Sequence, residues 1–131
     1  MLHGDLGNVA PNMPRSVKLP CGVAAKAIHF LSGISGWGYP ASPAGSVSMI
    51  VRLHFVSGAT EDHELMNGLH FADYLGHTDV KGSQPAFSLG QQQIRYLKIE
   101  PQRSDVIEAV ELIKGADKTA PVVMAITAEQ R

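Results

Sequence analysis

The sequence has 131 residues, of which 44% are hydrophobic and 18% charged, so it predicts one globular domain over 1–131 with its own apolar core. Eleven basic residues nearly balance twelve acidic ones, and the net charge of −1 argues against nucleic acid or an anionic membrane as a partner. The single cysteine, Cys21, excludes an internal disulfide and a cluster of thiolate metal ligands.

Residues 1–20 are predicted to be irregular, apart from a short strand over Ser16–Leu19. Residues 1–13 have neither the basic start nor the apolar run of a signal peptide, and no segment approaches the roughly 18 apolar residues of a membrane span. We therefore expect a soluble chain without an export signal in these residues. If the natural domain begins upstream of Met1, its first strand is truncated here. The sheet edge left open would favour a homodimer, because an unpaired edge invites pairing with a second copy.

The clearest strand covers Gly45–Val56, where every second residue is apolar and predicted to face a core. A turn at Ser57 and Gly58 leads into Thr60–Leu65, whose polar sequence predicts the hairpin partner of this strand at the edge of a sheet. The apolar residues that define the core face of the first strand are Val47, Met49, Val51, Leu53 and Phe55.

The same period of two predicts further strands, separated by glycine and proline turns: Ala25–Leu31, Ala86–Leu89, Gln93–Glu100, Val106–Lys114 and Val122–Ala128. Val106–Lys114 also fits a short helix, but its β-branched residues favour a strand. In the last strand, Val122, Met124 and Ile126 are expected to face inward. Short strands at this spacing predict an all-β fold, an antiparallel β-sandwich of the jelly-roll type.

Two long loops are predicted over residues 32–45 and 66–85, and loops of this length in a compact domain are usually functional. They contain aromatic and polar residues of the kind that bind sugars, because an aromatic ring can stack on a sugar ring while polar groups bond its hydroxyls. The alternative is that the single tryptophan closes the end of the core. The predicted ligand-binding residues are Trp37, Tyr39, His70, Asp73 and Tyr74.

Other chemistry finds less support in the sequence. A metal-dependent enzyme could use His63, His70, Asp73 and His77, but no metal-ligand motif is present. The acidic residues form no EF-hand loop, which leaves open only a structural calcium held by backbone carbonyls. A nucleophile elbow and a glycine-rich phosphate loop are also absent. We expect no catalytic residues and no other cofactor.

Several runs carry a family resemblance: 26–40 (KAIHFLSGISGWGYP), 45–54 (GSVSMIVRLH), 61–63 (EDH), 67–68 (NG), 70–74 (HFADY), 93–97 (QIRYL) and 120–125 (APVVMA). Together they resemble a C-terminal domain of large exported bacterial proteins that also carry a dehydrogenase-like propeller and a c-type haem domain. This domain is similar to galactose-binding-like jelly rolls, including the carbohydrate-binding module called NPCBM. The resemblance implies an exported, periplasmic or cell-surface location and sequence upstream of Met1, but no catalytic residues. The haem motif C-x-x-C-H does not occur.

The sequence thus predicts a non-catalytic module that binds carbohydrate. The first alternative is a structural or assembly domain that forms oligomers without a small ligand. The second is the metal-dependent enzyme described above.

Overall fold

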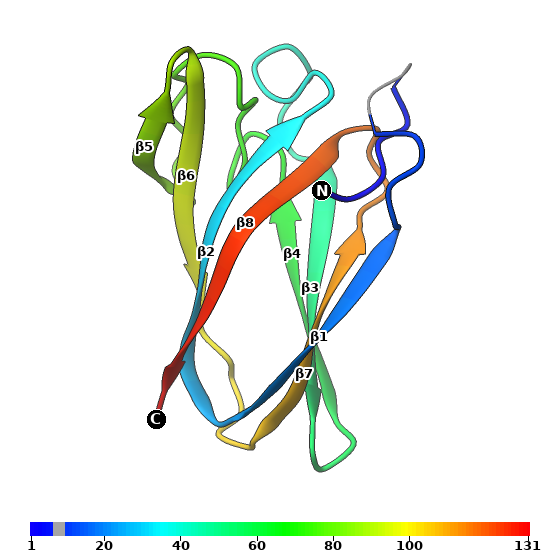
Figure 1. Cartoon of the computed structure of the whole chain (residues 1–131), viewed down its shortest axis with the longest axis vertical. Helices are drawn as coiled ribbons and strands as arrows, with labels where there is room; N and C mark the ends of the chain where they lie inside the picture. The colour runs from blue at the N-terminus through cyan, green and yellow to red at the C-terminus, as the bar shows by residue number, and fades with distance from the viewer. Residues whose placement is uncertain (7–9) are drawn as a thin grey trace.

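The computed structural model describes residues 1–6 and 10–131 as two antiparallel sheets of four strands that pack face to face (Figure 1). This confirms the predicted all-β sandwich, and the strand order is compatible with the finer jelly-roll prediction. The described residues contain no helix long and apolar enough to cross a membrane. The first sheet has the order β1 (Ser16–Val23), β7 (Ile107–Lys114), β3 (Val47–Phe55), β4 (Thr60–Met66). The second has the order β5 (Gln84–Leu89), β6 (Gln92–Ile99), β2 (Ala25–Ser35), β8 (Ala120–Gln130).

The core lies between the inner faces of the two sheets, and the period-two residues of the sequence form it. Met49, Val51 and Leu53 of β3 have no exposed surface, and Phe30 of β2 is 1% exposed. The segment that also fitted a helix is strand β7, which lies between β1 and β3 in the first sheet. Its strand form lets alternate residues reach the core, whereas a helix there would leave β1 without a partner and β3 paired only with β4.

β8 departs from the prediction because it contains a β-bulge. Leu31 of β2 pairs with Ala125, but the next residue of β2, Ser32, pairs with Val123, so Met124 is left without a partner. One extra residue changes which side chains face inward beyond that point. Val123 and Ile126 therefore pack against the core, whereas Met124 is 52% exposed. The prediction that Met124 faces the core is wrong, and Val122, which pairs with Gly33 and is half-buried, is not among the residues packed against the core.

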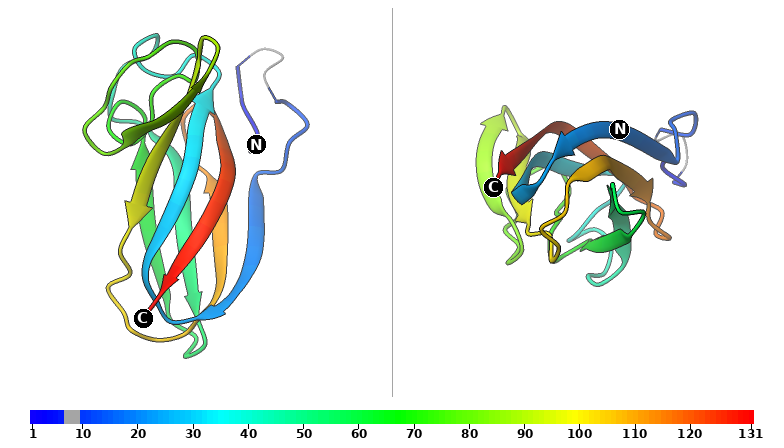
Figure 2. Two further views of the ribbon diagram at one scale, coloured as in Figure 1. Left: turned by 60° about the vertical axis from the view of Figure 1, so that its left-hand side comes forward. Right: turned by 90° about the horizontal axis from the view of Figure 1, so that it is seen from below.

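The N-terminal residues dock onto the start of β8. The backbone N–H of Leu2 donates to the carbonyl of Pro121 at 2.8 Å, and the Leu2 side chain is 3% exposed. β1 is longer than the predicted strand, since it continues to Val23, and it pairs with β7. β1 and β8 are thus edge strands of different sheets on the same side of the sandwich (Figure 2).

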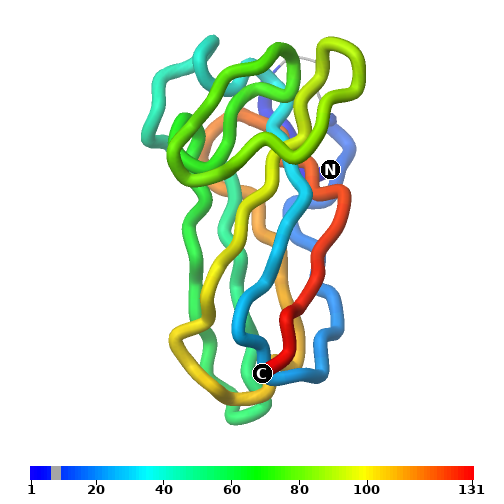
Figure 3. The backbone as a smooth tube through the Cα atoms, turned by 90° about the vertical axis from the view of Figure 1, so that its left-hand side faces the viewer, coloured from blue at the N-terminus to red at the C-terminus, as the bar shows by residue number. Residues whose placement is uncertain are grey.

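The long loops gather at one end of the sandwich, as Figures 1 and 3 show. The connection after β2, the segment between β4 and β5 and the β5–β6 turn all lie at this end. The shorter β1–β2 and β3–β4 connections lie at the opposite end. Both segments predicted to carry function therefore meet at one end.

We expect Phe30→Ala to lower the free energy of unfolding by about 3–5 kcal/mol, because it removes a buried ring and leaves a cavity. Phe87→Ala is the matched control, since Phe87 on edge strand β5 is 41% exposed. It should cost about 1 kcal/mol or less. Urea denaturation followed by circular dichroism measures both, and equal losses would contradict this position of the core.

Candidate functional site

A hollow of about 490 Å³ opens at the loop end of the sandwich. It brings together Trp37, Asp73 and Tyr74, three of the five residues predicted to bind a ligand. The end of β2, the loop that follows it and the segment between β4 and β5 supply its walls. The remaining lining residues are Ser35, Gly36, Pro40, Ala41 and Leu75.

Trp37 stands at the hollow with 68% of its surface exposed, so it does not close the end of the core. Its backbone φ of 64° lies in the left-handed region, which costs a residue with a Cβ atom roughly 1–2 kcal/mol. The next residue, Gly38, is buried, and a Cβ atom there would lie 2.4 Å from Ile34 Cγ2 and 3.2 Å from the Cα of Asp73. Close packing at Gly38 therefore holds the turn that presents the indole ring to solvent.

Asp73 connects the two loops of the site through its carboxylate. One oxygen accepts the backbone N–H of Gly38 at 2.7 Å, and the other accepts the N–H of Leu75 at 2.9 Å. Its own N–H donates to the carbonyl of Tyr39 at 2.8 Å. The Asp73 carboxylate therefore positions the Trp37 turn by joining it to the segment between β4 and β5.

Tyr39 and His70 do not line this hollow. The backbone N–H of Tyr39 donates to Asn67 Oδ1 at 2.8 Å, and its ring lies beside Gly68. His70 Nδ1 accepts the N–H of Met66 at 2.9 Å, and His70 lines a separate groove of about 370 Å³ together with His63. Burial lowers the pKa of His70 below its ordinary value. Both residues shape the loop rather than the candidate site.

The four residues that the alternative metal-dependent enzyme would use do not all meet at one place. His63 Nε2 lies 2.6 Å from a carboxylate oxygen of Glu61, His70 holds a backbone N–H, and Asp73 belongs to the hollow described above. His77 is exposed. Within residues 1–6 and 10–131, no three His, Cys, Asp or Glu side chains could share one metal ion.

Sequence reasoning missed the polar residues of β6 that hold the long loop. Arg95 is 1% exposed and donates to Ser83 Oγ at 2.6 Å and to Asp79 Oδ1 at 3.0 Å, while Gln93 Nε2 donates to the carbonyl of Asp73 at 2.9 Å. The sequence pattern could have indicated these residues, because the period of two places positions 93 and 95 on the same inward face of β6 as Leu97. A polar group at an inward position needs buried partners, and the neighbouring loop supplies them.

Trp37 also borders a second hollow, of about 460 Å³, on the side of the β7–β8 connection. Asp117 lies there and accepts bonds from Ser48 Oγ at 2.5 Å and Ser46 Oγ at 2.9 Å. Burial raises the pKa of Asp117, but these hydroxyl groups together with Thr119 and Lys114 outweigh burial and bring the pKa below its ordinary value. Asp117 is therefore a charged residue in the lining of this hollow, and its carboxylate holds Ser46 and Ser48 in place.

We expect Asp73→Asn to lower the free energy of unfolding by about 1–3 kcal/mol, because an amide has one acceptor oxygen and leaves one backbone N–H facing an NH₂ group. Asp62→Asn is the control. Asp62 and its partner Arg52 are 40% and 39% exposed, and a surface ion pair of this kind contributes little, so the change should cost less than about 1 kcal/mol. Equal effects in urea denaturation would show that the Asp73 carboxylate does not hold the loops.

We expect His70 to weaken the fold in acid. Its pKa is lower in the folded state than the ordinary value of 6.5, so the unfolded chain takes up the proton first. Its contribution is therefore fully present above pH 6.5 and is lost as the pH falls through the lower, folded pKa.

The measurement compares the wild type with His70→Asn, whose oxygen can accept the Met66 N–H without titrating. Urea denaturation between about pH 7.5 and about pH 5 should show the wild type losing more stability than the variant. Parallel losses in the two proteins would contradict the role given to His70.

Comparison of the chain with protein-family models, with curated proteins and with solved structures gives no match. The features available for a functional assignment are therefore the geometry of the sandwich and of its loop end.

Proposed function

We propose that this protein is a non-catalytic module that binds carbohydrate at its loop end. The observation that carries the proposal is Trp37, which is 68% exposed and stands beside a hollow of about 490 Å³. In the proposal the indole ring stacks on a sugar ring, the hydroxyl group of Tyr74 bonds a sugar hydroxyl, and Asp73 positions the loop.

The chemistry of the hollow supports a sugar as the ligand. Its volume is in the range of small-molecule sites, and its lining combines apolar groups with a few polar ones. One aromatic ring exposed beside hydroxyl groups suits a sugar, which has apolar C–H faces and a polar rim. The bonds that Asp73 makes hold the Trp37 turn in place before a ligand arrives, so little loop entropy is lost on binding.

The same lining argues for binding rather than catalysis. Asp73 and Tyr74 are the only side chains with a titratable proton among the residues that the structure places around this hollow. Each oxygen of the Asp73 carboxylate accepts one backbone N–H group. Hydrolysis of a glycosidic bond needs two carboxyl groups about 5–10 Å apart, and the described lining provides one.

A glycan array tests the proposal with the wild type, Trp37→Ala and the control Phe87→Ala, which removes another exposed ring. The wild type and the control should bind the same glycans, and Trp37→Ala should bind them about tenfold more weakly or worse, since stacking contributes about 1.4 kcal/mol. No binding by the wild type, or undiminished binding by Trp37→Ala, would overturn the proposal. Circular dichroism of each variant confirms that it is folded.

A further inference from the structure

Two open sheets leave four edge strands in the described fold: β1, β4, β5 and β8. The outer side of an edge strand offers unpaired N–H and C=O groups to any other extended chain. Proteins usually block such edges with charges, proline, bulges or short strand length. The four edges of this sandwich differ in how well they are blocked.

Three of the edges are blocked. β4 carries a run of acidic residues and one histidine over 61–64. β1 contains Lys18 and Pro20, and its pairing with β7 is irregular after that proline. β5 has only six residues and contains Pro85, which has no N–H to donate.

β8 is different, because it has eleven residues and no charge or proline between Val122 and Ala128. β2 is the one strand of the described chain that pairs with it. The bulge at Met124 and a second register shift, between Ala25 and Ala27 of β2, limit the regular part of the edge to Ala125–Glu129. The single charge in that part, Glu129, lies beside Lys26 of β2, with 3.3 Å between the carboxylate and the ammonium nitrogen.

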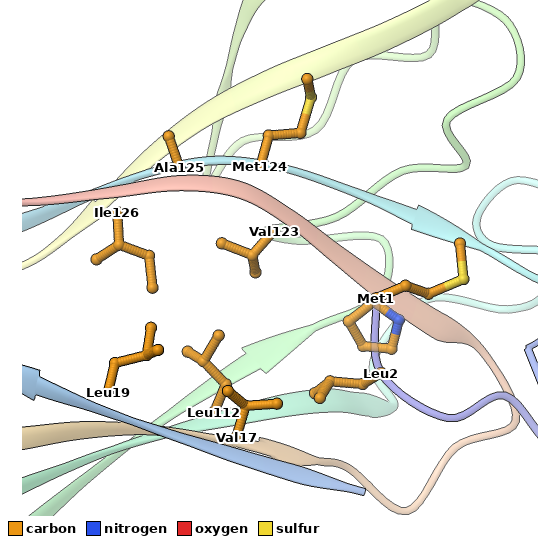
Figure 4. A pocket seen from close by; sticks show the side chains of 10 residues that line it. Met1, Leu2, Val17, Leu19, Leu112, Val123, Met124, Ala125 and Ile126 are labelled. Carbon is orange, nitrogen blue, oxygen red and sulfur yellow. The ribbon is translucent and has the colours of Figure 1, made fainter. Parts of the chain in front are cut away.

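An apolar groove runs behind this edge, between β8 and β1. Figure 4 shows Val123 and Ile126 of β8 pointing across the gap toward Val17 and Leu19 of β1. This groove has a volume of about 300 Å³, and a neighbouring hollow of about 350 Å³ continues it along Ile126 and Ala128.

The chain's own N-terminus shows what kind of segment this side accepts. Leu2 is 3% exposed, it closes one end of the groove, and its N–H donates to Pro121 of β8. A segment with a buried apolar side chain and a backbone hydrogen bond to β8 therefore already docks at the first residues of this strand. The regular stretch from Ala125 onward offers the same features.

We propose that a second copy of this chain covers the stretch, with β8 pairing antiparallel to β8 of the second copy about a two-fold axis at Thr127. In this register Thr127 faces its own copy, Ile126 faces Ala128 and Ala125 faces Glu129. Residues that face each other then lie on the same side of the sheet, so Ile126 and Ala128 extend the apolar inner layer. Facing threonines are a favourable cross-strand pair.

Self-pairing suits β8 and none of the other three edges. About an axis at Thr127, no like charges face each other and every residue from Ala125 to Glu129 has an N–H. The same operation on β4 about His63 would place Asp62 opposite Glu64, which is repulsive. On β1 and β5 it would place a proline in the new ladder. This difference argues for a second copy as the partner of β8.

The first test is the mass in solution by light scattering, for the wild type, Thr127→Lys and the control Ser88→Lys on β5. We expect a mass of two chains for the wild type and the control, and of one chain for Thr127→Lys, which places two charges face to face at the axis. A wild-type mass of one chain, a mass above two chains or a Thr127→Lys dimer would overturn the proposal.

The second test needs no disruptive substitution and keeps the proposal falsifiable if Thr127→Lys does not fold. In a Cys21→Ser background, Thr127→Cys should form a disulfide-linked dimer under mild oxidation, because the two positions face each other. Ala125→Cys should not, because in this register its two copies lie four residues apart, or about 13 Å. Cross-linking of both variants alike, or of neither, would overturn the register. The proposal is independent of sugar binding, which the glycan array tests separately.

Discussion

The contact between the inner faces of the two sheets is the constraint on which the rest of the molecule depends. Side chains such as Phe30 and Met49 lose nearly all their contact with water there, and this burial is the main favourable contribution to folding. Neither four-stranded sheet could stay folded with its apolar face in water, because a sheet has to bury that face against another layer. The face-to-face packing also fixes which strand ends, and therefore which loops, meet at one end.

At that end, hydrogen bonds from buried polar side chains take over the role that strand pairing has in the sheets. The segment between β4 and β5 has little regular structure, and several of its carbonyls accept hydrogen bonds from Arg95 and Gln93. Asp73 satisfies backbone N–H groups on both sides of the site. A loop held in this way can present an exposed tryptophan in a strained backbone conformation, because the surrounding bonds offset the strain.

The two proposed interactions use different parts of the sandwich. A sugar would meet the loop end at Trp37, whereas a second copy would meet the edge of β8 between Ala125 and Glu129. The first relies on an aromatic ring held by polar contacts, and the second on backbone groups and an apolar groove. Since Trp37 lies outside the proposed dimer interface, binding of a sugar and pairing of two chains are compatible.

The sequence by itself determined the strands, because a period of two along an extended backbone places alternate residues on opposite faces whatever the rest of the chain does. It also located the two long loops and the residues Trp37, Asp73 and Tyr74 of the candidate site. Only the tertiary structure decided that Tyr39 and His70 do not line the hollow, that Arg95 holds the loop and that a bulge exposes Met124. These outcomes depend on pairing between residues far apart in the chain, and a local pattern of apolar and polar residues carries no information about which distant partner a side chain meets.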